Sequence, residues 1–334
     1  MQTRQLGQGP FEVQPVIFGA WAIGGWYWGG TDDDRSVHAI QASIDAGVTA
    51  IDTAPMYGCG HSEKVVGRAI QGRRDQVILM TKVGLRWDDT GGAHFFDDWD
   101  DDANPLPIHR NLSAASVRLE VDRSLQRLGV ETIDLIQCHW PDPTTEIEET
   151  MDALASVVRA GKARAIGVSN FSPELLARAH AELARHGLPL SSTQPRYSLL
   201  RRGIETDVLP WCQDHQVGAI VYSPMEQGLL TGKVGPDRVF AADDGRSLDP
   251  AFSTENRIRV MQALEATKDL CARHSCTPAQ LSLAWCHHQP GVTAAIAGAR
   301  TPAQAIENAA AARIQLTRDA LETLRIAFDF TLAV

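Results

Sequence analysis

The stretch Thr49-Ala-Ile-Asp-Thr-Ala-Pro-Met-Tyr-Gly-Cys-Gly-His-Ser-Glu63 contains a clear strand-turn-helix pattern. A short apolar run ends in Asp52, a proline-containing turn follows with Tyr57 at its tip, and Ser62 and Glu63 open a helical pattern. A buried strand that delivers polar side chains to the loop beyond its C-terminal end is typical of enzymes built on α/β barrels. The stretch therefore predicts one βα unit of such a barrel, with an acid and a phenol on its active face.

Strand-like apolar runs alternate with segments of helical period along most of the chain. The strand-like runs cover residues 15–19, 48–53, 77–82, 133–139, 163–169, 192–195, 218–223 and 293–298. The helical segments cover residues 33–46, 62–70, 113–128, 145–160, 173–186, 205–215, 278–287 and 302–312. Eight buried strands that alternate with helices predict an α/β fold, a (β/α)8 TIM barrel. A doubly wound parallel sheet is the alternative, and the count of eight strands weighs against it.

Further segments exceed this alternation. Residues 3–14 predict a small N-terminal β-hairpin around a Gly-Gln-Gly-Pro turn, and residues 256–275 and 317–328 predict two additional helices. Residues 84–112 and 224–255 are long loops that follow strands, so we expect them on the active face of the barrel. Because no internal repeat or linker interrupts the pattern, we expect a single domain over residues 1–334.

The composition excludes several classes of protein. The 334 residues include 31 Lys and Arg against 41 Asp and Glu, a formal net charge of −10. Since there is no basic stripe, nucleic acid and membranes are not expected partners. No apolar run has the length of a bilayer span and the N-terminus lacks the apolar region of a signal peptide, so we expect a cytoplasmic protein. Six scattered cysteines without a C-x-x-C pair predict free thiols in a reducing cytosol.

Motifs for other chemistries are incomplete. No G-x-G-x-x-G motif follows a strand, which argues against a Rossmann site. The segment Gly228-Leu-Leu-Thr-Gly-Lys233 is too short between its glycines for a phosphate-binding loop of the P-loop type. The acid run at 97–102, interpreted as a calcium loop that starts at Asp98, has Ala103 and His109 where Gly and Glu are required. We therefore expect a solvated acidic loop and no metal site.

Four polar residues fall at or just past the C-terminal ends of three consecutive strands, namely Asp52, Tyr57, Lys82 and His139. Each alone has an ordinary interpretation, in turn a helix cap, a rim aromatic, a solvated lysine and a core histidine. Because all four converge on one mouth of the predicted barrel, we interpret them together as a catalytic group.

This group suits delivery of a proton to an oxygen while a hydride reaches the carbon. A tyrosine has an unperturbed pKa near ~10, so it needs a neighbouring cation that stabilises its phenolate. Lys82 would be that cation, and Asp52 would be the anion that keeps a buried lysine charged. His139 can donate a hydrogen bond to a substrate carbonyl oxygen.

Over essentially its full length the chain resembles the aldo-keto reductases. The matching pieces are Phe18-Gly-Ala-Trp21, residues 51–67, Thr81-Lys82, Leu135-Ile-Gln-Cys-His-Trp-Pro141, residues 161–171, Gln194, Tyr222-Ser-Pro224, residues 228–233 and Gly298-Ala-Arg300. The resemblance implies a barrel whose bottom is closed by the N-terminal hairpin. It also implies that Tyr57 is the general acid/base, that Asp52 and Lys82 tune it, and that His139 orients the carbonyl.

The resemblance further implies a nicotinamide cofactor, which we predict to be NADP(H). Ser169, Asn170 and Gln194 would bond the carboxamide and Tyr222 would stack on the ring, although a capping role for Asn170 is an alternative. The pyrophosphate would lie under the loop at 223–233. The predicted cofactor residues are Trp21, Ser169, Asn170, Gln194, Tyr222, Ser223, Pro224, Gly228, Leu230, Lys233, Gly298, Arg300, Gln304 and Asn308.

Residues 298–308 resemble the adenosine site of the family. Thr301 and Pro302 start a helix, and a helix N-terminus favours a phosphate. Arg300 would hold the 2′-phosphate of NADP(H) in forked geometry, with a solvated surface arginine as the alternative. Gln304 and Asn308 share one helix face and would reach the adenine.

The substrate is expected to be a small carbonyl compound, or an alcohol in the reverse direction. Substrate contacts are expected from the loop at 84–112, from Trp21 and from Trp26, Trp28, Trp87, Trp140 and Met225. Packing at the rim is the alternative role of the tryptophans.

The sequence therefore predicts an NADP(H)-dependent oxidoreductase that reduces aldehydes or ketones to alcohols, as a monomer or weak homo-oligomer. Two alternatives stay open. One is an NAD(P)-dependent sugar or alcohol dehydrogenase that uses the same site. The other is a non-catalytic, NADP(H)-binding redox-sensing subunit.

Overall fold

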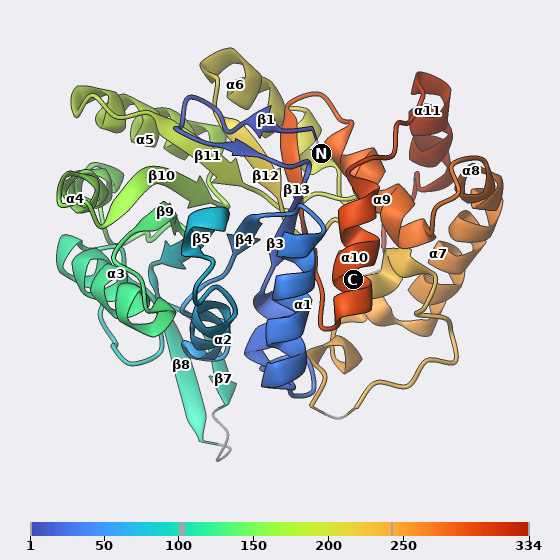
Figure 1. The fold of residues 1–334 in the computed structure, drawn as a ribbon, viewed down its shortest axis with the longest axis horizontal. Helices are drawn as coiled ribbons and strands as arrows, with labels where there is room; N and C mark the ends of the chain where they lie inside the picture. The colour runs from blue at the N-terminus through green and yellow to red at the C-terminus, as the bar shows by residue number, and fades with distance from the viewer. Residues whose placement is uncertain (1, 100–103, 242, 333–334) are drawn as a thin grey trace.

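Eight parallel strands close into a barrel in the computed structural model, which describes residues 2–99, 104–241 and 243–332 (Figure 1). In order around the barrel they are β3 (Val16–Gly19), β4 (Ala50–Asp52), β5 (Ile78–Val83), β9 (Ile133–Cys138), β10 (Ala163–Ser169), β11 (Leu190–Gln194), β12 (Gly218–Val221) and β13 (Val292–Gly298). The last strand closes onto the first through the pairs Ala297–Phe18 and Gly298–Gly19. The predicted (β/α)8 barrel is confirmed.

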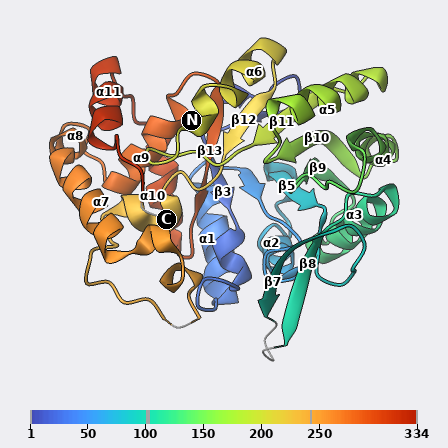
Figure 2. The same cartoon turned by 180° about the vertical axis from the view of Figure 1, so that it is seen from behind.

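Helices cover the outside of the barrel (Figures 1 and 2). They are α1 (Asp33–Asp45), α2 (His61–Ala69), α3 (Ala114–Leu128), α4 (Ile147–Arg159), α5 (Pro173–Arg185), α6 (Val208–His215), α9 (Pro278–His287) and α10 (Pro302–Ala311). Three of them start as their sequences predict, with a Ser or Thr side chain that accepts from the third residue beyond it and Pro in the first turn. These caps are Ser172, Thr277 and Thr301.

The N-terminal hairpin fills one end of the barrel. Its strands β1 (Arg4–Gln5) and β2 (Glu12–Val13) pair antiparallel, as predicted. Leu6, Phe11 and Val13 pack against the residues that point into the barrel from its strands. Gly7 has φ +56°, and a Cβ on it would lie 2.4 Å from the backbone oxygen of Ser191, so only glycine allows this close approach. The interior of the barrel is therefore a packed core, and a ligand site is expected at the opposite end, where the strands have their C-termini.

The segment 84–112 differs from its prediction as a long loop. It forms β6 (Leu85–Arg86), β7 (Ala93–Trp99) and β8 (Pro105–Arg110), an antiparallel sheet that projects from the barrel (Figure 1). In β7, more buried and exposed residues alternate, but the alternation breaks at Phe95 and Phe96, where a β-bulge between His94 and Phe96 shifts the register against β8. Asp97 and Asp98 of the acid run lie in β7, whereas its residues 100–102 lie outside the described ones.

The additional helices also differ in part from their prediction. Residues 256–275 form two helices, α7 (Thr254–Ala266) and α8 (Lys268–Arg273), separated at Thr267. The Thr267 hydroxyl donates to the carbonyl oxygens of Ala263 and Leu264, a local bond that competes with helix continuation. α11 (Arg318–Ala327) forms as predicted, and α7, α8 and α11 lie on the side of the barrel away from α3 and α4 (Figures 1 and 2).

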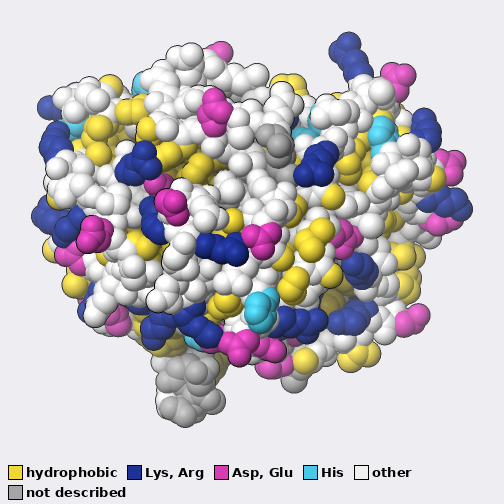
Figure 3. Space-filling model, in the orientation of Figure 1, with side chains coloured by type: hydrophobic (Ala, Val, Ile, Leu, Met, Phe, Trp, Pro, Cys, Tyr) yellow, Lys and Arg dark blue, Asp and Glu magenta, His cyan; other side chains and the backbone are white. Residues whose placement is uncertain are grey.

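The surface carries charges of both signs. On the face drawn in Figure 3, Lys and Arg side chains are interspersed with Asp and Glu. Among the described residues, the helices are too short or too polar for any of them to traverse a lipid bilayer.

Candidate active site

Lys82 is the central residue of a polar group at the C-terminal end of the barrel. Its side chain is 1% exposed. Its Nζ donates to Asp52 Oδ2 at 2.6 Å, to the backbone oxygen of Thr53 at 3.0 Å and to the Tyr57 hydroxyl at 3.1 Å. These three bonds use the full donor capacity of an ammonium group. Lys82 therefore links the acid to the phenol.

The electrostatic balance of this group keeps Lys82 charged and Tyr57 neutral. Burial by itself would lower the pKa of Lys82, but the neighbouring Asp52 and Tyr57 outweigh burial and raise that pKa above its ordinary value. Burial raises the pKa of Tyr57, and the charge of Lys82 opposes this rise without overcoming it. Tyr57 is consequently a phenol that holds a proton to donate, with a cation in place to stabilise the phenolate left behind.

Two amides hold the other side of Asp52. Its Oδ1 accepts from Gln137 Nε2 at 3.1 Å and from Gln194 Nε2 at 2.9 Å. Gln137 pairs in register with Lys82 across β9 and β5. Sequence reasoning missed Gln137, although it lies two residues before His139 and so points to the same side of the strand.

His139 lies beside the phenol. Its ring centroid is 5.7 Å from that of Tyr57, with the planes at 83°. Burial, and after it the charge of Lys82, lowers the pKa of His139 well below its usual range. The imidazole is therefore uncharged at neutral pH, and in this form one of its ring nitrogens carries an N–H that can donate a hydrogen bond.

The turn that aims Tyr57 depends on two glycines. A Cβ on Gly24 would lie 2.6 Å from the carbonyl carbon of Tyr57, and one on Gly58 would lie 2.2 Å from the backbone oxygen of Gly24. Gly58 also has φ +66°. The glycines thus let the loop after β3 press against the loop after β4, which fixes the direction of the phenol.

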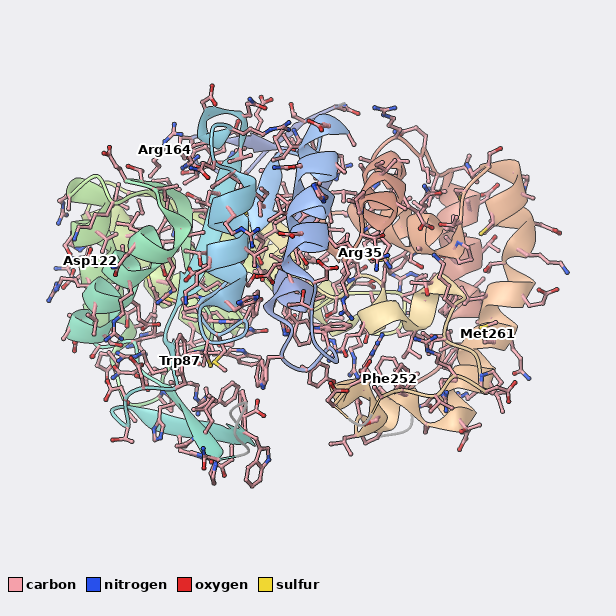
Figure 4. All side chains as sticks on the ribbon, turned by 60° about the horizontal axis from the view of Figure 1, so that its bottom comes forward. Arg35, Trp87, Asp122, Arg164, Phe252 and Met261 are labelled. Carbon is pink, nitrogen blue, oxygen red and sulfur yellow. The ribbon has the colours of Figure 1, made fainter. Side chains whose placement is uncertain are left out.

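A cavity of about 910 Å³ opens at this end of the barrel. The residues singled out in the sequence that line it are Trp21, Trp26, Trp28, Asp52, Tyr57, His139, Trp140, Ser169, Asn170, Gln194, Tyr222, Ser223, Pro224, Met225, Gly228, Lys233, Gly298, Arg300, Gln304 and Asn308. Lys82 lies behind Asp52 and Tyr57. Leu230 is fully buried in the core, and Trp87 packs near Met56 and Leu85 where the β6–β8 sheet meets the barrel (Figure 4). The cavity therefore gathers most of the residues singled out in the sequence.

The middle of the cavity holds a connected amide and hydroxyl network. Asn170 adopts φ +62°, and its Nδ2 donates to the backbone oxygen of His139 at 3.1 Å. The Tyr222 hydroxyl donates to Asn170 Oδ1 at 3.0 Å, and Ser169 Oγ donates to the backbone oxygen of Gln194 at 2.7 Å. Asn170 is not a helix cap, since Ser172 caps α5. The network presents donors and acceptors next to the polar group around Lys82.

Five cationic side chains line the cavity, and the part of the cavity that they line is its basic end. Its cationic side chains are Arg196, Lys233, Arg238, Arg246 and Arg300. The adjoining turn η4 (Glu226–Thr231) contains successive left-handed residues, with φ +44°, +52° and +106° at Glu226, Gln227 and Gly228. Glu226 is 1% exposed and accepts a hydrogen bond from Arg196 NH2 at 2.6 Å, and this ion pair stabilises the turn. Sequence reasoning missed Arg196, Arg238 and Arg246 because no local motif marks them.

Arg300 joins two loops across the rim of the cavity. Its NH1 donates to the backbone oxygen of Trp28 at 2.9 Å, and NH2 donates to that of Gly30. Its backbone N donates to Gln304 Oε1 at 2.8 Å. Arg300 is thus an ordered rim residue.

The β6–β8 sheet supplies an aromatic wall to the cavity that holds Tyr57 and His139. Phe96 of β7 stacks on Trp26, with ring centroids 6.4 Å apart and planes at 13°. The ring centroids of Phe95 and Trp140 are 5.2 Å apart. All four rings line the cavity, and the two phenylalanines were expected only as part of the whole 84–112 segment.

The chain belongs to the aldo/keto reductase family, whose model matches residues 15–328. It is 39% identical over 307 residues to aldo-keto reductase YhdN of Bacillus subtilis (strain 168), a match that covers 91% of this chain and 86% of that protein. It is 38% identical over 332 residues to the NADH-specific methylglyoxal reductase of Escherichia coli (strain K12), covering 97% of each. A solved structure, that of the glycerol dehydrogenase AKR11B4 from Gluconobacter oxydans, matches with a TM-score of 0.83 and 37% identity over 97% of this chain and 94% of that chain.

Glu120 of α3 fixes the backbone just beyond Lys82. Both of its carboxyl oxygens lie 3.1 Å from the backbone N of Gly84, and Ser116 Oγ donates to it at 3.1 Å. Burial raises the pKa of Glu120 to about 8, against the opposing effects of the Gly84 N–H and Arg86. Glu120 is thus a buried acid that is mostly protonated at neutral pH.

We expect the Glu120→Gln variant to gain stability relative to the wild type as the pH rises. The folded state keeps this proton up to a pKa of about 8, whereas the unfolded chain releases it near ~4.3. Between these values the folded state binds more protons, so rising pH destabilises the wild type, by an amount on the order of a few kcal/mol. Glutamine mimics the neutral acid and does not ionise. Urea unfolding at about pH 5 and about pH 9 measures the change, and a stability difference that is the same at both pH values contradicts it.

Proposed function

We propose that this chain is an NADP(H)-dependent oxidoreductase that reduces aldehydes or ketones to alcohols. The observation that supports this best is Lys82, which bonds Asp52 and Tyr57 at once at 2.6 and 3.1 Å. Together with neutral His139 beside the phenol, this provides a proton donor and an oxygen-orienting donor at one point of the cavity. Carbonyl reduction needs both.

Two observations support a dinucleotide in the cavity. Its volume of about 910 Å³ is adequate for one, and it is lined by cationic residues, of which Arg196 and Arg246 bond to the strained η4 turn. In the described part of the chain, Trp28 Nε1 and Arg196 Nε are buried without a hydrogen-bond partner, and both side chains line the cavity. Buried orphan donors are costly, and an anionic or polar ligand would satisfy them.

When bound, the reduced nicotinamide supplies the hydride. We infer that Asn170, Ser169 and Gln194 orient its carboxamide, and that Tyr222 covers the ring. His139 then donates to the carbonyl oxygen of the substrate, and Tyr57 transfers its proton to the same oxygen. Lys82 stabilises the resulting phenolate, while Asp52 keeps Lys82 charged. The aromatic wall excludes water, which strengthens these interactions.

Glu307 supports a second candidate, an NAD(P)-dependent sugar or alcohol dehydrogenase that uses the same site. Its carboxylate lines the basic end of the cavity and lies 3.5 Å from Lys233 Nζ. A carboxylate at this end repels a 2′-phosphate and can accept from a ribose hydroxyl. Of the relatives, the NADH-specific methylglyoxal reductase agrees by name with the use of NAD(H), and the glycerol dehydrogenase agrees by name with the oxidation of an alcohol.

The Arg300→Ala variant separates the two cofactors. We expect the Kd for NADPH to rise about 10- to 100-fold and that for NADH to rise less than about threefold, because a charge-assisted bond to phosphate contributes about 1.5–3 kcal/mol. Loss of the bond to the Trp28 carbonyl should affect both cofactors alike. Fluorescence titration of the wild type and of Arg300→Ala with each cofactor provides the measurement. Equal losses for NADPH and NADH would mean that Arg300 orders the loop and does not bind the 2′-phosphate.

A panel of carbonyls and sugars, assayed with NADPH, NADH and their oxidised forms, tests the proposed activity. We expect NADPH consumption with at least one aldehyde or ketone. NADPH that binds but is not consumed with any carbonyl would favour the redox-sensing subunit. The proposal includes a cytoplasmic location and a monomer or weak homo-oligomer, and size-exclusion chromatography over a range of concentrations tests the latter.

A further inference from the structure

Cys271 and Cys276 lie on the two sides of the turn that joins α8 to α9. Cys271 belongs to α8, and the turn closes with a hydrogen bond from Cys276 N to Cys271 O at 2.9 Å. Ser275, in between, adopts φ +50°, which reverses the chain. Both cysteines are partly exposed, whereas Cys138, Cys212 and Cys286 are buried. The pair is thus close in space and open to small molecules.

The two thiols are hydrogen-bond partners and differ in acidity. The bond from Cys276 lowers the pKa of Cys271 below its usual value, and the same bond raises the pKa of Cys276. Because the thiolate is the reactive form, Cys271 is the readier nucleophile and Cys276 is the thiol placed to resolve it. Burial raises the pKa of Cys212 to about 12, so this buried thiol is inert by comparison.

The turn is directly connected to the basic end of the cavity. Cys276 precedes Thr277, which caps α9 and whose hydroxyl donates to Glu307 Oε1 at 2.7 Å. Gln280, the partner of Thr277 in the capping box, donates from Nε2 to the backbone oxygen of Glu307 at 2.8 Å. Ala279 and Glu307 both line the cavity. A displacement at Cys276 therefore reaches the cavity through one residue and two hydrogen bonds.

We propose that Cys271 and Cys276 form a reversible dithiol–disulfide modification site whose oxidation changes the shape of the basic end of the cavity. The oxidant class is a hydroperoxide. The Cys271 thiolate attacks one peroxide oxygen, which forms a sulfenic acid as the O–O bond breaks and, with a proton from solvent, releases water or an alcohol. The Cys276 sulfur then attacks the Cys271 sulfur, the S–O bond breaks, and the hydroxyl leaves with the Cys276 proton as water. A small dithiol reverses the reaction by thiol–disulfide exchange.

The geometry of the turn accommodates this bond. A disulfide needs Cα atoms about 4.4–6.8 Å apart, and the Cys276 N to Cys271 O bond already brings the two backbones together. The two sulfur atoms must approach to about 2.05 Å when they bond. This draws Cys276 toward α8 and moves Thr277 relative to Glu307. We therefore expect the disulfide form to hold a dinucleotide more weakly.

Peptide mapping and cofactor titration of the full chain test the two parts of this proposal. After treatment with hydrogen peroxide and alkylation, we expect one peptide pair linked through Cys271 and Cys276. The Kd for NADPH or NADH should rise about threefold or more and return to its starting value with dithiothreitol. The mapping does not depend on the proposed function, so a failure of cofactor binding and a failure of disulfide formation are distinguishable.

The Cys271→Ser and Cys276→Ser variants are the matched controls, since each keeps the exposed Cys59. Neither variant should form the linked peptide or show a peroxide-dependent and dithiothreitol-reversible change in Kd. Recovery of both cysteines as alkylated thiols from the peroxide-treated wild type would overturn the modification site. A disulfide that leaves the Kd unchanged, or a change in Kd that persists in Cys271→Ser, would overturn its link to the cavity.

Discussion

Replacement of Tyr57 with phenylalanine is expected to lower the rate of carbonyl reduction by at least about 10³-fold, within the range that a general acid contributes. The phenyl ring keeps its packing between Trp21 and His139, and only the hydroxyl is lost. Lys82 keeps its bonds to Asp52 and to the Thr53 carbonyl, so its charge stays satisfied. Steady-state rates of NADPH oxidation with an active carbonyl provide the measurement.

Cofactor binding separates this chemical effect from damage to the fold. The Kd of the Tyr57→Phe variant for NADPH should stay within about twofold of the wild-type value, since the hydroxyl is not among the groups proposed to bind the dinucleotide. Turnover that is unchanged in the variant would remove Tyr57 from its role. A parallel loss of affinity would point to a disordered turn around Gly58.

Replacement of Lys82 with methionine is expected to abolish turnover and also to lower the free energy of unfolding by about 3–5 kcal/mol. Asp52 is 2% exposed, and without Lys82 its charge is left with the amide donors of Gln137 and Gln194. Methionine has a similar length, so loss of the charge is the main change. Urea or thermal unfolding measures the stability, and cofactor oxidation measures the activity.

The double variant Lys82→Met/Asp52→Asn identifies the cause. With no buried charge left unpaired, it should recover a large part of the lost stability, whereas activity should stay absent because no cation faces Tyr57. Equal instability of the single and double variants would show that packing around Lys82, and not the unpaired carboxylate, accounts for the loss.

Most of the fold could be predicted from the sequence because a parallel barrel imposes local patterns. Its strands are buried on both faces and therefore appear in the sequence as apolar runs. The start of a helix such as α5 is marked by a capping Ser172 followed by Pro173. β7 and β8 could not be predicted, since they pair mainly with each other and a β-bulge between His94 and Phe96 breaks the alternation of β7. The break at Thr267 depends on a side-chain bond that no periodicity records.

The candidate site divides in the same way. Asp52, Lys82 and His139 could be found because the ends of parallel strands meet at one mouth of a barrel. Arg238 and Arg246 could not, because they come from an irregular segment whose course over the cavity is set by tertiary contacts. One such contact is the hydrogen bond from Arg246 NH1 to the backbone oxygen of Gln227. The balance between burial and charge at Tyr57 also needs the folded surroundings, since the sequence shows the neighbouring cation but not the degree of enclosure.

The pairing of the first barrel strand with the last has a consequence for biosynthesis. On the ribosome, all four members of the Asp52–Tyr57–Lys82–His139 group emerge early, but β3 has no partner on its open side until β13 is synthesised. The hydrogen bonds that Arg4 of the hairpin donates to the backbone oxygens of His287 and Val292 also form only after these residues are synthesised. Pairing β3 with β13 across so long a stretch of chain lowers the chain entropy before the new contacts stabilise the barrel. The nascent chain therefore carries the Asp52–Tyr57–Lys82–His139 group through most of translation, and the cavity proposed to hold a dinucleotide is completed only when β13 docks.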